Sequence, residues 1–345
     1  MNNITTIGID LAKNIFQVHC NDKNGNKVKS KRLTRKQLPE FIANLSSCLI
    51  GMEACSSAHY WARLFTSYGH DVKLMSPQYV KPYVKTNKND MADAEAIAEA
   101  VTRSNMRFVP IKNTAQQDIL CLHKVRERIV KNRTSLSNQI RGLLLEYGIT
   151  VNIGKSALKA KLAILIDDES LLLTPMMKEL ISDLYAEYVA LDEKVKLYDT
   201  KIENLVQSNE QCKRLMAIPG VGPISATAMY ASLGNVSVFK KGRHVSAWLG
   251  IVPKQLSSGN KTLLCGISKR GNGYLRQLLI HGGRAVLKSL GDKNDNFSSW
   301  ARKLSQRAGF NKAAVAIANK NARHIWALLS GQEKYNDKLA CRYNV

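Results

Sequence analysis

The first 103 residues alternate between short apolar runs and amphipathic segments, in an order that few folds accommodate. Three strand-like runs come first, and the sequence DKNGN at 22–26 supplies turn chemistry between the second and third. Helical and strand-like segments then take turns as far as an alanine-rich helix. The predicted strands are 4–10, 15–20, 27–33, 48–52 and 72–75, and the predicted helices are 35–45, 59–68 and 91–103. The order β-β-β-α-β-α-β-α predicts a mixed sheet covered by helices.

Two long helical segments follow. Apolar residues recur at three- and four-residue intervals from Gln116 to Tyr147, and 187–206 repeats the pattern. The two segments bracket 158–173, and residues 111–210 hold 14 basic and 14 acidic side chains. The pattern predicts an antiparallel or coiled-coil module that projects or dimerises, although an ordinary helical linker domain would give the same periodicity.

A glycine-containing turn opens the last part of the chain. Gly220 and Gly222 lie between two apolar segments in LMAIPGVGPISATAMYASL (215–233) and predict a helix-hairpin-helix. In that motif, glycines let backbone N–H groups and a helix N-terminus approach a phosphate closely. A tight structural turn is the alternative. A Gly/Ser loop at 257–260, a basic turn at 267–274 and two or three helices to about residue 330 are expected after it.

Charge is distributed unevenly. Residues 211–291 contain twelve Lys or Arg and no Asp or Glu, and residues 211–345 hold 22 basic against 4 acidic side chains. Lys and Arg gain affinity for nucleic acid by releasing the counterions condensed on phosphates. A cationic surface that only aids solubility, or a basic membrane-facing patch, is the alternative. Because these basic residues alternate with Gly, Pro and Ser loops, a phosphate backbone is the favoured partner.

Four carboxylates in the first part have positions suited to chemistry. Asp10 ends the strand TTIGID and Glu53 ends CLIGME, where a carboxylate is costly unless it points into a site. Asp90 and Asp93 lie three apart at a helix start, on one face. Each has a structural reading as a helix cap, a first-turn acid or a solvated strand end. Together they predict an oxygen cage for two Mg²⁺ ions in a ribonuclease-H-like core.

Other patterns exclude some classes of protein. No apolar run approaches the roughly 18 residues of a membrane span, and the N-terminus lacks signal-peptide features, so a cytoplasmic protein without membrane partners is expected. The seven cysteines form no CxxC pair and are predicted to be reduced structural thiols. Without HxxxH or HExxH spacing, a lone histidine such as His123 or His281 is predicted to be a core residue or a phosphate contact.

Five motifs give the chain a family resemblance. They are IGIDLAKNIFQVH around Asp10, GMEACSSAHYWA around Glu53, NKNDMADAEAIAEA around Asp90 and Asp93, IPGVGPISA at 218–226, and WLGIVPKQLSSGNKTLLCGISKRGNGYLRQLLIHGGRA at 248–285. The chain resembles bacterial insertion-sequence transposases that pair a RuvC-like DEDD domain with a C-terminal serine domain. These are the Piv and MooV invertase class, with insertion-sequence families one-ten and eleven-eleven.

The resemblance implies an enzyme and its residues. Asp10, Glu53, Asp90 and Asp93 would hold Mg²⁺, while a C-terminal serine attacks DNA to form a 5′-phosphoserine. Ser258, directly before Gly259, matches the family serine best, and Ser257 is the adjacent alternative. Because a serine hydroxyl needs activation, the carboxylates must come close to this segment during catalysis. Five basic residues are expected to contact flanking phosphates: Lys254, Lys261, Lys269, Arg270 and Arg276.

The resemblance also implies partners and a domain plan. DNA at the element ends and at the target is the substrate, a structured noncoding RNA is the guide, and the protein assembles as a dimer to tetramer. The expected domains are a RuvC-like domain at 1–112, a long-helix module at 113–210 and a mostly helical basic domain at 211–345. A Holliday-junction resolvase or nuclease that uses water, and a non-catalytic nucleic-acid-binding or RNA-chaperone protein, are the alternatives.

Overall fold

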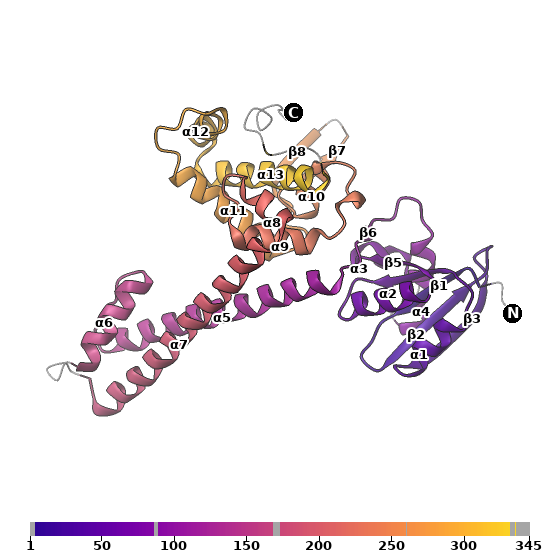
Figure 1. Cartoon of the computed structure of the whole chain (residues 1–345), viewed down its shortest axis with the longest axis horizontal. Helices are drawn as coiled ribbons and strands as arrows, with labels where there is room; N and C mark the ends of the chain where they lie inside the picture. The colour runs from indigo at the N-terminus through magenta and orange to yellow at the C-terminus, as the bar shows by residue number, and fades with distance from the viewer. Residues whose placement is uncertain (1–3, 86–88, 168–172, 260, 332–334, 336–345) are drawn as a thin grey trace. The chain divides into compact units, whose positions relative to one another are not determined.

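The computed structural model describes residues 4–85, 89–167, 173–259, 261–331 and 335 (Figure 1). The chain divides into two compact units, one formed by 1–117 with 233–240 and the other by 118–232 with 241–345. None of the described helices is long and apolar enough to cross a membrane. The division predicted from sequence has three parts and stays a prediction.

The first unit is a mixed six-stranded sheet with helices. Its strands lie in the order β3-β2-β1-β4-β5-β6, in which β1–β4 and β4–β5 are parallel and the other pairs are antiparallel. The strands are β1 (Thr6–Asp10), β2 (Ile15–Asn21), β3 (Lys27–Thr34), β4 (Leu49–Glu53), β5 (Asp71–Met75) and β6 (Phe108–Val109). The helices are α1 (Gln37–Ala43), α2 (Ala58–Ser67), α3 (Pro77–Val80) and α4 (Asp90–Val101), with a 3₁₀ turn η1 (Lys81–Tyr83). The mixed sheet predicted from the element order is confirmed, whereas the two-residue strand β6 was not predicted.

The core of this unit explains why its strands and helices could be predicted from the pattern of apolar residues. Alternate residues of β1 and β2, including Ile7, Ile9 and Phe16, are fully buried. Trp61 of α2 packs edge-on against Phe16, with ring centroids 5.1 Å apart. The outer strand β3 and the helices are buried on one side only, whereas β1 and β4 are covered on both faces and were predicted as continuous apolar runs.

Three helices form an antiparallel module in the second unit. They are α5 (Thr114–Glu146), α6 (Lys155–Asp167) and α7 (Pro175–Gln207). Arg126 pairs with Asp199 while Arg133, seven residues later, pairs with Asp192, seven residues earlier, so α5 and α7 run in opposite directions (Figure 1). Buried leucines of α6 pack with apolar residues of α5 and α7 in one cluster. The helix predicted from residue 187 begins at Pro175, about three turns earlier. Helix α6 was not predicted.

The remainder of the second unit is mostly helical. The helices are α8 (Glu210–Met216), α9 (Pro223–Leu233), α10 (Gly242–Trp248), α11 (Gly273–Lys288), α12 (Asn296–Ala308) and α13 (Phe310–Leu329), and the 3₁₀ turn η2 (Val236–Val238) belongs to the first unit. One exposed hairpin, β7 (Pro253–Ser258) with β8 (Lys261–Ile267), interrupts them. The expected Gly/Ser loop at 257–260 is therefore wrong at its start, because Ser257 and Ser258 end a strand. The Gly-Asn pair at 259–260 was the available hairpin signal, although Asn260 lies outside the described residues.

Candidate active site and nucleic-acid interface

Strand register sets Asp10 beside Glu53. Ile9 of β1 pairs with Met52 of β4 in a parallel ladder, so the two carboxylate residues that follow end neighbouring strands at one edge. Gly8 and Gly51 are also paired in register, and side chains alternate along a strand. Asp10 and Glu53 consequently share the sheet face on which the two glycines lie.

Helix α4 packs directly on that face. A Cβ atom on Gly8 would lie 2.2 Å from the carbonyl oxygen of Ala94, and one on Gly51 would lie 2.8 Å from the Cβ of Val101. Only glycine permits so close an approach, which explains both glycines in IGID and IGME. The helix that carries Asp90 and Asp93 is thereby held against the two strands that carry Asp10 and Glu53.

The first turn of α4 is capped by Asn89. The Asn89 side chain accepts a hydrogen bond from the Ala92 N–H at 2.8 Å, so Asp90 follows the cap and is not the cap itself. Asp90 is exposed and Asp93 is half-buried. Both carboxylates lie where the positive end of the helix dipole favours negative charge.

The four carboxylates provide the kind of donor that Mg²⁺ prefers, since all are oxygen ligands. Across the part of the chain that the structure describes, no three His, Cys, Asp or Glu side chains gather closely enough to hold a metal ion. The donor set therefore fits the ion in chemistry, although the described side chains are not gathered into a ligand cluster.

Cys55, which was expected to be a reduced structural thiol, is a free and exposed cysteine two residues after Glu53. Partial desolvation of its thiol raises the pKa above the ordinary value, and the negative charges of Glu53 and Asp10 raise that pKa further. The thiol therefore shares the electrostatic environment of the two carboxylates.

The two candidate serines lie at the end of the β7–β8 hairpin. Ser257 pairs with Thr262 and Ser258 with Lys261, and Gly259 adopts φ 53° at the turn. Because neighbouring residues of a strand point to opposite faces, the two hydroxyls belong to different faces of the hairpin. Ser257 shares its face with Gln255, whose Nε2 donates a hydrogen bond to the Ser257 Oγ at 2.9 Å.

The basic turn after the hairpin is packed against α10. A Cβ on Gly271 would lie 2.0 Å from the carbonyl oxygen of Trp248, and Lys269 adopts φ 53°. Arg276 Nη1 donates to the carbonyl oxygens of Leu249 and Arg270, at 3.0 and 3.1 Å. Arg276, expected as a phosphate contact, thus also fixes the shape of the turn. The other four basic candidates, Lys254, Lys261, Lys269 and Arg270, are exposed.

The turn between α8 and α9 has one glycine that packing requires. Gly220 adopts φ 83°, and a Cβ there would lie 2.7 Å from the carbonyl oxygen of Gly282 in α11. Gly222 has open space where its Cβ would be. A close approach to α11 therefore accounts for Gly220, whereas the space at Gly222 leaves room for a ligand.

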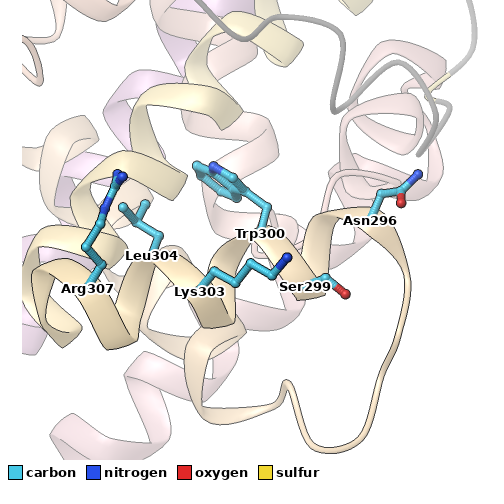
Figure 2. Close-up of a pocket in the computed structure, with 6 residues that line it drawn as sticks. All are labelled: Asn296, Ser299, Trp300, Lys303, Leu304 and Arg307. Atoms are coloured by element: carbon cyan, nitrogen blue, oxygen red, sulfur yellow. The ribbon is translucent and has the colours of Figure 1, made fainter.

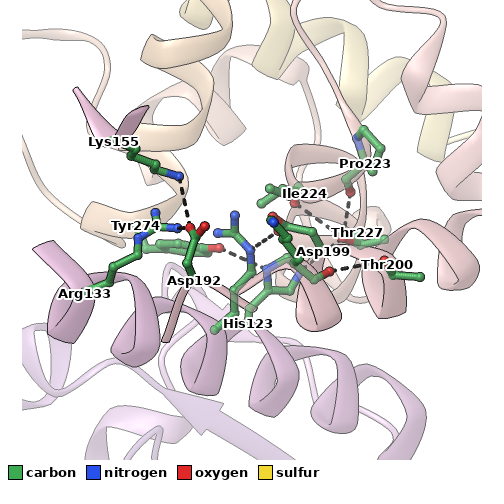
Figure 3. A network of polar contacts seen from close by, with 12 residues as sticks. His123, Arg133, Lys155, Asp192, Asp199, Thr200, Pro223, Ile224, Thr227 and Tyr274 are labelled. Carbon is green, nitrogen blue, oxygen red and sulfur yellow. Dashed lines mark hydrogen bonds and ion pairs between the residues drawn. The ribbon is translucent and has the colours of Figure 1, made fainter. Parts of the chain in front are cut away.

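His123 connects three helices through buried hydrogen bonds (Figure 3). Thr227 Oγ1 donates to the carbonyl of Pro223 at 2.7 Å, so it accepts from His123 Nε2 at 3.0 Å. His123 Nδ1 then accepts from the Tyr274 hydroxyl at 3.0 Å. Burial and the nearby Arg126 lower the pKa of His123 to about 4, so the ring is neutral. The predicted core role of this histidine is confirmed.

Two family models match this combination of a carboxylate-bearing mixed sheet and a basic helical part. One, described as "Transposase", matches residues 7–149, and the other, "Transposase IS116/IS110/IS902 family", matches residues 212–298. The class of protein is a DNA transposase of an insertion sequence.

Curated relatives align along almost the whole chain. The transposase for insertion sequence element IS1111A of Coxiella burnetii is 47% identical over 335 residues, which are 97% of this chain and 92% of the relative. A probable family 20 transposase of Pseudomonas aeruginosa is 46% identical, with 96% and 99% covered. The transposase for IS1328 of Yersinia enterocolitica is 39% identical, with 95% and 97% covered. The chain belongs to the IS110/IS116/IS902 transposase family.

Proposed function

We propose that this transposase excises and inserts DNA by Mg²⁺-assisted attack of a hairpin serine on a DNA phosphate, forming a 5′-phosphoserine. The observation that carries the proposal is the register of β1 on β4, which sets Asp10 beside Glu53 under a helix bearing two more carboxylates. Two carboxylates at the ends of neighbouring parallel strands supply oxygen ligands to a single cation. The first unit is accordingly proposed to be a RuvC-like catalytic domain.

Asp10, Glu53, Asp90 and Asp93 would hold the ion. Bound Mg²⁺ would polarise the scissile phosphoryl oxygen and offset the charge that develops there. The serine hydroxyl is a weak nucleophile at neutral pH, so its proton must pass to a base before or during attack. Lys261 is paired with Ser258 across the hairpin and would bind a flanking phosphate.

Substitution of Asp10 tests the metal site. Asp10→Asn removes one ligand charge while keeping the side-chain shape, and we expect loss of strand exchange with DNA binding retained. Glu40→Gln removes an exposed carboxylate of α1 in the same unit and should leave exchange intact. Full exchange by Asp10→Asn would show that the carboxylates are structural and would favour a non-catalytic nucleic-acid-binding protein.

The two serines form a matched pair for testing the nucleophile. Ser258→Ala should abolish strand exchange and the covalent protein–DNA adduct, whereas Ser257→Ala, on the opposite face, should retain both. The adduct is measured by denaturing electrophoresis of labelled DNA. The reverse result would assign the reaction to Ser257. Cleavage by both variants would favour water as nucleophile, as in a resolvase.

Contacts with DNA are proposed at the α8–α9 turn and the basic loops. We place phosphates at Gly222, which has open space, and at Lys254, Lys261, Lys269 and Arg270, which are exposed. Gly220, in the same turn, and Arg276 would act by shaping the interface. The α8–α9 pair would then serve as a helix-hairpin-helix.

A guide RNA and a dimer to tetramer complete the proposal. Both are inferred from the resemblance of the chain to its family, and the antiparallel α5–α7 module would supply the surface for self-association. Sequencing of RNA that copurifies with the protein should return a species complementary to element ends and target. Light scattering of the purified chain should give a mass above the 38.4 kDa of one copy. Copurification of RNA without such complementarity would contradict the guide RNA. A monomeric mass at the concentration used for strand exchange would contradict self-association.

A further inference from the structure

Helix α12 lines an open cavity of about 510 Å³ (Figure 2). The lining residues are Asn296, Ser299, Trp300, Lys303, Leu304 and Arg307. Spacings of three and four residues place them along one face of the helix. Because every lining residue belongs to α12, the cavity is an open depression along one helix face, accessible to an extended ligand.

Trp300 is the fixed part of this cavity. The Nζ of Lys320 lies 4.3 Å from the Trp300 ring centroid, and Lys320 is only 3% exposed. The Phe297 ring lies one turn earlier on α12, with its centroid 5.8 Å from that of Trp300. The buried cation over the ring, the aromatic neighbour and the apolar cluster that includes Val286 and Ile317 hold the indole in place. The part of the half-buried ring that stays accessible lines the cavity. A rigid aromatic surface costs little entropy when a planar group stacks on it.

The positive charge near the Trp300 ring favours a polyanionic ligand. Lys303 and Arg307 line the cavity and are exposed, while Asp295, the nearby acid, accepts hydrogen bonds at the N-terminus of α12. The surrounding residues 211–345 hold 22 basic and 4 acidic side chains. An aromatic ring with flanking cations is the combination that binds a nucleobase by stacking and its phosphates by charge. An acidic peptide would satisfy the cations but not the planar ring.

We propose that the α12 cavity binds an unpaired base of the DNA on which this transposase acts. The base stacks on Trp300, and Lys303 and Arg307 contact the adjoining phosphates. Strand exchange on DNA passes through unpaired nucleotides, which duplex DNA does not offer. The family match ends at residue 298, so Trp300 and both cations lie beyond the matched residues. The proposal rests on DNA transposase activity and not on the identity of the nucleophile.

Binding of the full chain to single-stranded and duplex oligonucleotides tests this site. Trp300→Leu should weaken single-strand binding about tenfold, since stacking of one base contributes on the order of 1–3 kcal/mol. Duplex binding should stay unchanged. Trp300→Phe should keep most of the affinity because an aromatic face remains. Phe310→Leu, which removes an exposed aromatic side chain at the start of α13, should have no effect.

Photocrosslinking gives a readout independent of variant stability. An oligonucleotide with 5-iodouracil should crosslink to the wild-type protein at the α12 peptide containing Trp300. A crosslink elsewhere, or equal losses for single-stranded and duplex DNA, would overturn the proposal. RNA of the same sequence serves as a comparison. If it binds more tightly than DNA and loses more affinity in Trp300→Leu, the assignment of the site to DNA is wrong. Variants of the two serines and of Asp10 should bind single-stranded DNA like the wild type. A failure of the proposed strand-exchange chemistry can therefore be distinguished from a failure of the α12 site.

Discussion

At the scale of single residues, a side chain could be assigned a role from the sequence only when the signal for that role lies nearby in the chain. Asp10 and Glu53 were found because each ends an apolar strand, which is a local signal. His123 was recognisable only as a lone histidine, because its partners Thr227 and Tyr274 lie 104 and 151 residues further along the chain. No periodicity encodes such contacts. The sequence therefore predicts which carboxylates could act and leaves the buried polar connections to the structure.

The neutral state of His123 predicts acid sensitivity. The pKa falls from 6.5 to about 4 on folding, so between these values the unfolded state binds the extra proton. Stability from this residue is complete above pH 6.5 and is lost as pH falls toward 4, by on the order of 3 kcal/mol. His123→Gln should lower stability at neutral pH and flatten the dependence between pH 4 and 6.5. Urea unfolding at several pH values measures both effects.

A matched control separates His123 from other acid effects. His59 and His324 have pKa values also lowered to about 4, chiefly by burial, and contribute in the same window. His281 is exposed, and His281→Gln should leave the stability at neutral pH unchanged, unlike His123→Gln. An unchanged slope in His123→Gln would show that the buried ring does not titrate on unfolding.

At the scale of helices and strands, the elements that were predicted correctly have at least one buried face. The strands and helices up to α4 follow alternation or helical periodicity closely. The β7–β8 hairpin has no buried face: Leu256, Leu263 and Leu264 are 50%, 58% and 62% exposed. Without a core to face, its residues carry no period-two pattern. The start of α7 was missed for another reason, since its signal is local capping by Thr174 with Pro175 in the first turn.

The α5–α6–α7 module depends on one buried carboxylate. Asp192 accepts from Arg133 at 2.6 Å and from Lys159 at 2.7 Å, and the side chains of Asp192 and Arg133 are each 9% exposed (Figure 3). The Lys159 hydrogen bond is the main cause of the lowered pKa of Asp192. Asp192→Asn would leave buried positive charge unpaired, which costs about 3 kcal/mol. Thermal unfolding followed by circular dichroism should show a lower Tm.

The control for this ion pair lies on the same helix. Asp183 of α7 is exposed, and Asp183→Asn should change the Tm little. A wild-type Tm in Asp192→Asn would mean that the cluster contributes nothing net to stability.

At the scale of the whole molecule, the units are not continuous in sequence. Residues 233–240 belong with the first unit, although about 115 residues separate them from its end at 117. Gly234, at φ 60°, lies so close to Pro110 that a Cβ would be 3.3 Å from the proline Cβ. Local patterns place boundaries only where composition changes along the chain. A segment that returns to an earlier unit leaves no such change.

The excess of positive charge predicts steep salt dependence of DNA binding. Each phosphate neutralised on duplex DNA contributes about 0.9 to the slope of log K against log salt. Lys254→Gln with Lys261→Gln removes two exposed charges from the acid-free stretch 211–291 and should reduce the slope by about 2. Lys194→Gln with Lys196→Gln removes two exposed charges from α7, within residues 111–210, where 14 acids balance 14 bases, and should leave the slope unchanged. Fluorescence anisotropy over a salt series measures both. Equal reductions from the two pairs would mean that net charge, rather than the basic hairpin, governs binding, and a flat wild-type response would contradict a phosphate interface altogether.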